Sequence, residues 1–223
     1  MSKLEGKVAI ITGAGRGVGK ATAFMLARDG AKIVVNDLDA SEARAVAQEL
    51  VEAGHGAIAC AGNVTDSLFP NQLMQTTLDA YGQIDILVNN AGYIWNGAMH
   101  NHSDEQWHAM LDVHVTAPFR ILRSFSTWLR QQAKKEIAEN GEANCRKIVN
   151  VSSVSGTLGS ATQIAYSSGK SAIVGLTKTL AKEWGRYNIT VNCVAFGHIE
   201  TRLTQSCDGE PPLIEVDGRE HRV

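Results

Sequence analysis

The sequence contains no long hydrophobic run and little cysteine or proline. No segment approaches the roughly 18 apolar residues that a membrane-spanning helix needs, so we expect no membrane partner. The four cysteines are far apart and form no C-x-x-C pair: Cys60, Cys145, Cys193 and Cys207. This spacing favours reduced thiols over disulfides or a metal site.

Positive and negative charges are nearly balanced. The 21 Lys and Arg residues and 23 Asp and Glu residues give a formal net charge of -2, which offers no reason to propose a nucleic-acid partner. The N-terminal segment carries charges where a signal peptide needs an apolar core, so we expect a cytoplasmic protein. His100, His102 and His108 are explained by a polar loop leading into a helix, and we predict no metal site.

Short β-branched runs alternate with amphipathic segments along the chain. We expect six strands, at 7–12, 31–37, 57–64, 85–88, 147–152 and 189–195. The segments between them are expected to be helical, with capping patterns at Asp39, Asp66 and Ser103, and Pro118 predicts a bend or local break near Ala117. This alternation predicts an α/β fold with a doubly wound parallel sheet and helices on both faces, and 223 residues fit a single domain, 1–223.

A glycine-rich loop follows the first predicted strand. Gly13, Gly17 and Gly19 stand at G-x-x-x-G-x-G spacing, and a helix begins directly after them. Glycines let the backbone approach a pyrophosphate, and the helix N-terminus attracts its negative charge. Tight strand-to-helix turns also favour glycine, but the strand, loop and helix together indicate a dinucleotide site.

An acidic residue ends the second predicted strand about twenty residues later. Asp37 can accept hydrogen bonds from an adenosine ribose and would repel a 2′-phosphate, so NAD is favoured over NADP. Arg16 in the glycine loop keeps NADP open, because an arginine there could attract a phosphate. Asp37 could also be a simple turn residue, although Asp39 and Glu42 have capping-box spacing and would leave Asp37 free.

Three residues with acid–base chemistry gather near the fifth strand. Ser153 ends that strand, and Tyr166 and Lys170 form an i, i+4 pair if the chain is helical from about Thr162. An ammonium beside a phenol favours the phenolate, which would bring the tyrosine closer to useful acid–base chemistry. Each of these features also occurs by chance in surface helices and turns.

Taken in order, the glycine loop, Asp37, the NNAG segment at 89–92, Ser153, Tyr166 and Lys170 resemble the short-chain dehydrogenase/reductase family, in particular its 3-oxoacyl-carrier-protein reductase-like branch. The resemblance implies a Rossmann-type fold and an oxidoreductase that moves hydride between NAD(P) and a carbonyl or secondary alcohol. Tyr166 would transfer the proton, Ser153 would bind the oxyanion, and Lys170 would lower the tyrosine pKa. The cofactor-binding residues implied are Gly13, Arg16, Gly17, Val18, Gly19, Asp37, Asn63, Val64, Asn89, Ala91, Gly92, Tyr166, Lys170, Gly197, Ile199 and Thr201.

The sequence departs from the family pattern at three positions. His114 replaces the asparagine that usually serves the proton relay, and it is either a relay residue or a core histidine bonded to a backbone carbonyl. Phe196 replaces a proline before Gly197, which removes a rigid φ. Asn63 replaces an acid at the adenine contact.

The substrate is left open between a small secondary alcohol or ketone, a steroid and a 3-oxoacyl or 3-hydroxyacyl thioester. We place Ile94, Trp95, Gln163 and Phe196 in the substrate pocket, although Ile94 and Trp95 could equally pack within their own loop. The alternative function is a catalytically impaired relative that binds nucleotide as a scaffold.

The C-terminal segment 205–223 is predicted to be an irregular or hairpin tail, with Asp217 and Gly218 as the turn. Family members continue into a seventh strand, so the resemblance implies a C-terminally shortened chain with an exposed sixth strand. A homodimer or homotetramer is expected if this end permits it.

Overall fold

A computed structural model describes residues 2–200 and the backbone of two further strands, β7 (Leu213–Val216) and β8 (Arg219–Arg222). The antiparallel β7–β8 pair aligns Val216 with Arg219, so it has the register of the predicted hairpin. The predicted turn residues Asp217 and Gly218, and the predicted cofactor residue Thr201, lie outside the described residues.

The main sheet has six parallel strands, as the sequence predicts, and their order is β3-β2-β1-β4-β5-β6. The strands are β1 (Val8–Ile11), β2 (Lys32–Val35), β3 (Ala57–Ala59), β4 (Ile86–Asn89), β5 (Arg146–Ser153) and β6 (Ile189–Phe196). The chain winds outward from β1 in one direction and from β4 in the other, so the strand order reverses between β1 and β4. In such sheets ligands bind outside the carboxyl ends of the strands at this point.

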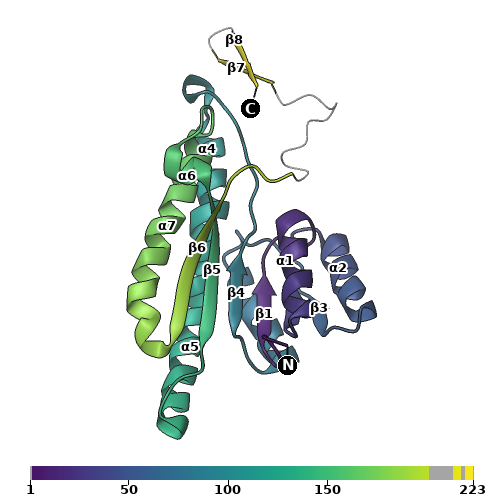
Figure 1. Cartoon of the computed structure of the whole chain (residues 1–223). Coiled ribbons are helices and arrows are strands. Elements are labelled where there is room, and N and C mark those ends of the chain that lie inside the picture. Colours follow the sequence, from purple (N-terminus) through teal and green to yellow (C-terminus); the bar gives the residue numbers. More distant parts are fainter. Residues whose placement is uncertain (1, 201–212, 217–218, 223) are drawn as a thin grey trace.

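Helices cover both faces of the sheet (Figure 1). Alternate residues of β1 divide between the two cores: Ala9 and Ile11 pack with α1 and α2, and Val8 and Ile10 pack on the opposite face with α3, α5 and α7. The helices and short helical turns are α1 (Gly17–Arg28), α2 (Ala40–Glu52), α3 (Phe69–Tyr81), η1 (Met99–Asn101), α4 (Asp104–Leu111), η2 (Asp112–Thr116), α5 (Ala117–Asn140), α6 (Val154–Leu158), α7 (Ile164–Trp184) and η3 (Gly185–Tyr187).

Two of the predicted boundaries that differ from the structure have a local cause. Strand β3 ends at Ala59 rather than residue 64, because the Asn36 amide donates to the carbonyls of Cys60 and Gly62 and draws the chain out of the ladder. Helix α3 begins at Phe69, since the Asp66 carboxylate accepts the Leu68 N–H and forms a turn instead of capping the helix.

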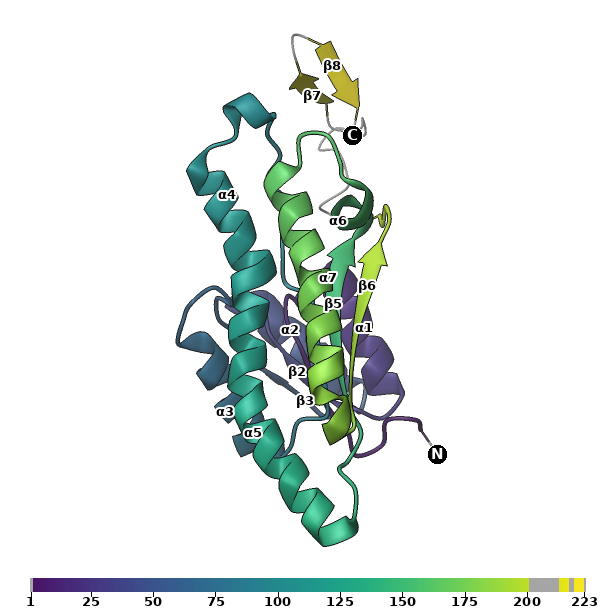
Figure 2. The ribbon, with the colours of Figure 1, turned by 90° about the vertical axis from the view of Figure 1, so that its left-hand side faces the viewer.

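The predicted cap of the long helical segment is present, and the predicted interruption near Ala117 is a local break rather than a bend. The Ser103 hydroxyl accepts the Gln106 N–H at 3.2 Å, and the Gln106 side chain accepts the Ser103 N–H at 2.8 Å. Residues 112–116 then form a π-helical turn before α5, whose first turn contains Pro118. The wider turn includes His114, and Figure 2 shows α4 and α5 in line on either side of it.

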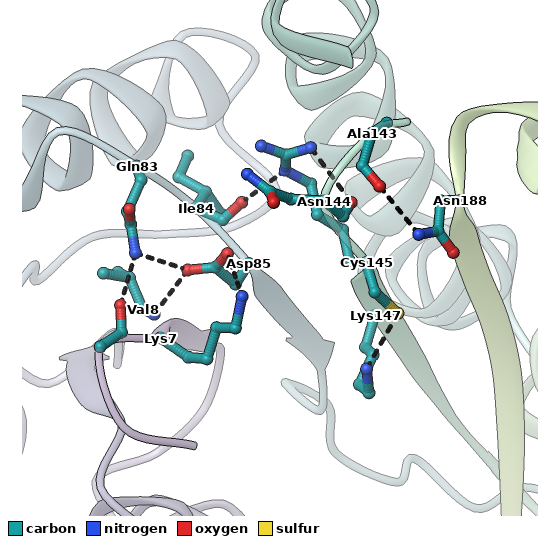
Figure 3. A network of polar contacts seen from close by, with 12 residues as sticks. Lys7, Val8, Gln83, Ile84, Asp85, Ala143, Asn144, Cys145, Lys147 and Asn188 are labelled. Carbon is teal, nitrogen blue, oxygen red and sulfur yellow. Dashed lines mark hydrogen bonds and ion pairs between the residues drawn. The ribbon is translucent and has the colours of Figure 1, made fainter. Parts of the chain in front are cut away.

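Polar contacts also join the amino ends of neighbouring strands, at the edge of the sheet opposite their carboxyl ends (Figure 3). The Asp85 carboxylate accepts the Val8 N–H at 2.9 Å and the Gln83 amide at 2.9 Å, and Lys7 lies 3.5 Å from it. Buried Arg146 forms two hydrogen bonds with Glu136, which lowers the pKa of that carboxyl to about 2. These contacts anchor the amino ends of β1, β4 and β5 and carry no site chemistry.

Among residues 2–200, no helix is long and apolar enough to cross a membrane.

Candidate active site

The glycine loop joins β1 to α1 and lies against the NNAG segment at 89–92. Gly13 has φ +63°, and a Cβ there would come within 2.8 Å of the Ala91 Cα. A Cβ on Gly19 would meet the Gly13 carbonyl oxygen at 2.1 Å. Both positions therefore require glycine, because backbone atoms occupy the space that a side chain would need.

Two side chains that the sequence analysis missed hold these segments together. The Thr12 hydroxyl accepts the N–H groups of Asn90 and Ala91, each at 3.0 Å. The Asn90 amide donates in return to the carbonyls of Thr12 and Gly13 at 2.9 Å. The sequence shows a threonine after a strand and an asparagine in NNAG, but it does not show that the two residues hydrogen-bond to each other.

The Asp37 carboxylate lies beside the glycine loop, as expected, but it is not free. It accepts the Gly15 N–H at 2.9 Å and the Asp39 N–H at 3.1 Å. A carboxylate offers about four acceptor positions, so it can still accept from a ribose hydroxyl. Asp39 caps α2 as predicted by accepting from Ser41 and Glu42, but no reciprocal contact from the Glu42 side chain to the cap backbone is present in the described contacts.

The Arg16 side chain is directed to α2 rather than along the loop. Its Nη2 atom lies 3.1 Å from a carboxylate oxygen of Asp39 and 3.1 Å from one of Glu42. The hydrogen bond and charge of Glu42 raise the pKa of Arg16 further. The guanidinium therefore already has two anionic partners within the chain.

Three further predicted cofactor residues have their own contacts. The Asn63 side chain accepts the backbone N–H of Thr65 at 3.0 Å, and buried Asn89 donates its amide to Asn150 at 2.8 Å. Val64 and Asn89 line a small cavity with Thr12 and Ala91, under the start of α5. Asn89 therefore joins β4 to β5, and its side-chain oxygen has no partner among the described residues.

Ser153, Tyr166 and Lys170 come together at the carboxyl edge of β5, as the sequence predicts. Ser153 ends β5 and caps α6, where its hydroxyl accepts the Ser155 N–H at 3.2 Å, and it lies close enough to Tyr166 to affect the pKa of the tyrosine. Tyr166 and Lys170 lie one turn apart in α7, with the Lys170 ammonium 5.7 Å from the centre of the tyrosine ring.

The predicted lowering of the tyrosine pKa is not present in this geometry. Burial raises the pKa of Tyr166, and the nearby Ser153 hydroxyl opposes this rise only in part. The Lys170 ammonium donates to the Val151 carbonyl at 2.8 Å and lies over the ring, so its charge is not directed at the phenol oxygen. Burial lowers the pKa of Lys170 itself to about 8.

His114 is buried in the π-helical turn and faces both the NNAG segment and α7. Its Nε2 atom lies 2.8 Å from the Tyr93 carbonyl, and its ring meets the Tyr166 ring edge-on at 5.1 Å between centroids. A Cβ on Gly92 would come within 2.3 Å of the imidazole, so glycine there leaves room for it. Burial and the nearby Lys170 charge lower the pKa of His114 to about 3, and the ring is neutral at pH 7.

The predicted substrate-pocket residues lie on two adjoining segments. Gly97 pairs with buried Gln163 in an isolated bridge, and its N–H donates to the Thr162 carbonyl at 2.8 Å, so the 93–102 loop lies along the start of α7. Phe196 is the strand partner of Ser153. Ile94 is half-buried, whereas Trp95 is 38% exposed and therefore does not pack fully within its loop.

These elements share one end of the molecule. The start of α4, α6 and the start of α7 lie at the same end as the carboxyl ends of the strands (Figure 1 and Figure 2). The predicted cofactor residues Gly197 and Ile199 follow β6 at this end and are exposed. The histidines of the 100–108 segment do not form a group suited to a metal among the residues that the structure describes.

The loop fits a dinucleotide pyrophosphate. Glycine at every second position of the loop leaves its backbone open there, and within residues 2–200 no side chain caps the N-terminus of α1 and no acidic residue lies in its first turn. The N–H groups of that turn can therefore bind phosphate oxygens. A glycine loop at the switch point, with serine, tyrosine and lysine beside it, defines a dinucleotide-dependent oxidoreductase site of the Rossmann type.

Comparison with known proteins identifies the family. A family model described as short chain dehydrogenase matches residues 7–211, and the chain belongs to this family. A 3-oxoacyl-[acyl-carrier-protein] reductase of Synechocystis is 39% identical over 96% of this chain and 82% of its own length. A hydroxyacyl-CoA dehydrogenase of Mycobacterium tuberculosis is 36% identical over 96% of this chain and 67% of its own length.

Solved structures give the same result for the fold. A short chain dehydrogenase from Mycobacterium avium superposes with a TM-score of 0.82 at 37% identity, covering 91% of this chain and 71% of that one. A 3-ketoacyl-(acyl-carrier-protein) reductase from Brucella melitensis, complexed with NADH, has a TM-score of 0.82 at 31% identity, covering 90% and 79%. The chain is therefore an oxidoreductase that acts on CH–OH or carbonyl groups with a nicotinamide cofactor. Nothing in these comparisons favours the scaffold alternative.

Proposed function

We propose that this protein is an NAD-dependent oxidoreductase that interconverts a 3-oxoacyl and a 3-hydroxyacyl thioester. The observation that carries the proposal is the grouping of Ser153, Tyr166 and buried Lys170 at the carboxyl edge of β5, with the Lys170 ammonium 5.7 Å from the centre of the tyrosine ring. The bound nicotinamide supplies or accepts the hydride.

In the reduction, the Tyr166 hydroxyl donates a proton to the carbonyl oxygen of the substrate, and in the oxidation it removes the alcohol proton. The Ser153 hydroxyl donates to the same oxygen and stabilises its developing negative charge. The Lys170 ammonium donates to the Val151 carbonyl and lies over the Tyr166 ring, so it must turn toward the phenol oxygen to stabilise the tyrosinate that remains. A buried ammonium acts strongly here because little water screens it.

His114 holds Tyr166 in position and does not itself take up the transferred proton. With a pKa of about 3 it stays neutral through the reaction, and its edge-on contact supports the Tyr166 ring. Its Nε2–H donates to Tyr93, which leaves the unpartnered Nδ1 atom as a hydrogen-bond acceptor.

Two observations support the choice of cofactor and substrate. Asp37 lies at the end of β2 beside the glycine loop, where its charge favours a ribose hydroxyl and repels a 2′-phosphate. The exposed apolar side chains around the active-site edge suit an acyl chain: Tyr93, Trp95, Met99, Val154, Leu158, Ile164 and Ile199. Relatives from both carrier-protein and CoA thioester metabolism are consistent with this class.

We also propose that the protein self-associates. Trp107 on α4 and Phe119 on α5 are 36% and 46% exposed, and large apolar side chains on neighbouring helical surfaces favour an interface between copies. Sedimentation velocity should give a dimer or tetramer, and a monomer at all accessible concentrations would contradict this.

The proposed function is tested by turnover of the purified protein. NADH and 3-oxobutanoyl-CoA should give a loss of absorbance at the nicotinamide band, and the rate with NADPH should be lower. A small ketone tests the substrate class and should react more slowly than the thioester. The absence of turnover with every thioester and cofactor, although the protein is folded, would reject the proposal.

A further inference from the structure

The Arg16 guanidinium and three carboxylates form a compact charged group beside the glycine loop. Arg16 lies 3.1 Å from both Asp39 and Glu42, and Asp37 binds the adjacent Gly15 N–H. A Cβ on Gly15 would lie 2.8 Å from an Asp37 oxygen and 2.8 Å from the Glu42 Cβ, so these segments are in close contact. One cation among three anions gives this group a net charge of -2.

An arginine at this place has two possible partners. It can bind the 2′-phosphate of NADP, or it can remain with the carboxylates that already contact it. The side chains are between 37% and 47% exposed, so water screens each ion pair and no single contact is strong. The balance therefore depends on how many carboxylates compete for the guanidinium.

We propose that Asp39 and Glu42 are cofactor-selecting residues, because they keep Arg16 as their own ion-pair partner and withhold it from a 2′-phosphate. The inference rests on the proposed preference for NAD and adds to it. Asp37 repels the phosphate directly, and the other two carboxylates remove the cation that would compensate. NAD has no 2′-phosphate and is indifferent to this second effect.

Two conservative substitutions remove the carboxylate charges and preserve the local structure. Asp39→Asn retains the cap of α2, because asparagine caps helices as well as aspartate. Glu42→Gln keeps the length of the side chain. The double variant should bind NADPH about tenfold more tightly, as expected when the released Arg16 guanidinium pairs with the 2′-phosphate, with NADH changed less than about twofold.

Two controls test whether Arg16 is responsible for the gain in NADPH affinity. Adding Arg16→Ala to the double variant should abolish the gain in NADPH affinity. Glu49→Gln removes a carboxylate that contacts Lys20 at 2.8 Å between the same two helices, and it should leave the NADPH affinity within about twofold. This variant separates the release of Arg16 from a general change in local charge.

The test is a titration of each variant with NADH and NADPH, followed by nicotinamide fluorescence, which requires no turnover. A selective gain for NADPH that depends on Arg16 supports the inference. Wild-type binding of NADH with no gain in the double variant overturns the inference and leaves the proposed function standing. Failure of the folded wild-type protein to bind either dinucleotide overturns both.

Discussion

The two parts of the active site satisfy their polar groups very differently. In the glycine-loop region, residues 12–19, 37 and 89–92, the polar side chains of Thr12, Asp37 and Asn90 are hydrogen-bonded within the chain, and Asn89 Oδ1 is the one buried unpaired side-chain atom found there in residues 2–200. In the substrate-side region, residues 93–114 and 153–170, six of the eight buried unpaired polar atoms found in residues 2–200 gather: Asn96 Oδ1, both ring nitrogens of His102, His114 Nδ1, Gln163 Oε1 and Ser167 Oγ.

This difference shows which part of the active site is preorganised. Buried polar groups are normally paired, so a concentration of unpaired ones is a local cost in stability. The glycine-loop region uses its hydrogen bonds to fix the backbone that approaches the cofactor. The substrate-side region retains hydrogen-bonding capacity that its own neighbours do not use.

Tyr166→Phe should have the largest effect and should divide the two regions. Removing the acid–base hydroxyl should lower kcat by roughly a thousandfold or more, since general acid–base catalysis contributes this order of magnitude. The affinity for NADH should stay within about threefold. Equal losses in rate and NADH affinity would show that the two regions are not separable.

Gly19→Ala should damage the glycine-loop region. A Cβ there would lie 2.1 Å from the Gly13 oxygen and 2.6 Å from the Asn90 amide, so the loop must move and NADH affinity should fall by about a hundredfold. Gly175→Ala in α7 is the matched control, because a Cβ there meets nothing within 4 Å. The control should keep its affinity, and unchanged NADH binding in Gly19→Ala would refute the loop geometry.

Thr12→Val should measure the preorganisation directly. It leaves the N–H groups of Asn90 and Ala91 without their acceptor, which should cost about 2–3 kcal/mol in the free energy of unfolding. Thr12→Ser keeps the hydroxyl and should lose much less. Chemical denaturation of the two variants gives the comparison, and equal stability would contradict the role of the hydroxyl.

His114 should make the stability depend on pH in mildly acidic solution. Its pKa falls from 6.5 in the unfolded chain to about 3 in the folded protein, so between these values the unfolded chain binds a proton that the folded protein does not. The stability is fully present above pH 6.5 and declines as the pH falls, by about 2 kcal/mol at pH 5. Unfolding curves of His114→Asn at pH 7 and pH 5 should lack this component, whereas exposed His108→Asn should retain it.

Gln163→Met should have the smallest effect on stability. It removes a buried oxygen that has no partner, so the free energy of unfolding should stay within about 1 kcal/mol of the wild type or rise. KM for the thioester should increase if this group serves the substrate. A loss as large as that of Thr12→Val would remove the contrast between the two regions.

The six-stranded parallel sheet and the meeting of Ser153, Tyr166 and Lys170 could be predicted from the sequence. Parallel strands bring their carboxyl ends to one edge, and a helical spacing of four residues fixes the tyrosine–lysine pair. The end of β3 and the start of α3 could not be predicted. Asn36, which is distant in sequence from β3, and Asp66, which is close to α3, take over backbone hydrogen bonds there.

The contacts of individual side chains were also beyond the sequence. Thr12 pairs with a segment 78 residues away, and Arg16 is held by Asp39 and Glu42, which only the packing of α1 against α2 decides. The pKa of Tyr166 depends on where the Lys170 ammonium points, and an i, i+4 spacing does not determine this direction.

The most direct test of the account is one titration of the wild-type protein with NADH, followed in the same sample by 3-oxobutanoyl-CoA. The account predicts saturable NADH binding with a change in nicotinamide fluorescence, and then loss of the reduced nicotinamide signal when the thioester is added. Folded protein that shows no NADH binding would contradict the assignment of the glycine-loop region. Binding without oxidation by this or any longer 3-oxoacyl thioester would contradict the proposed chemistry of Ser153, Tyr166 and Lys170.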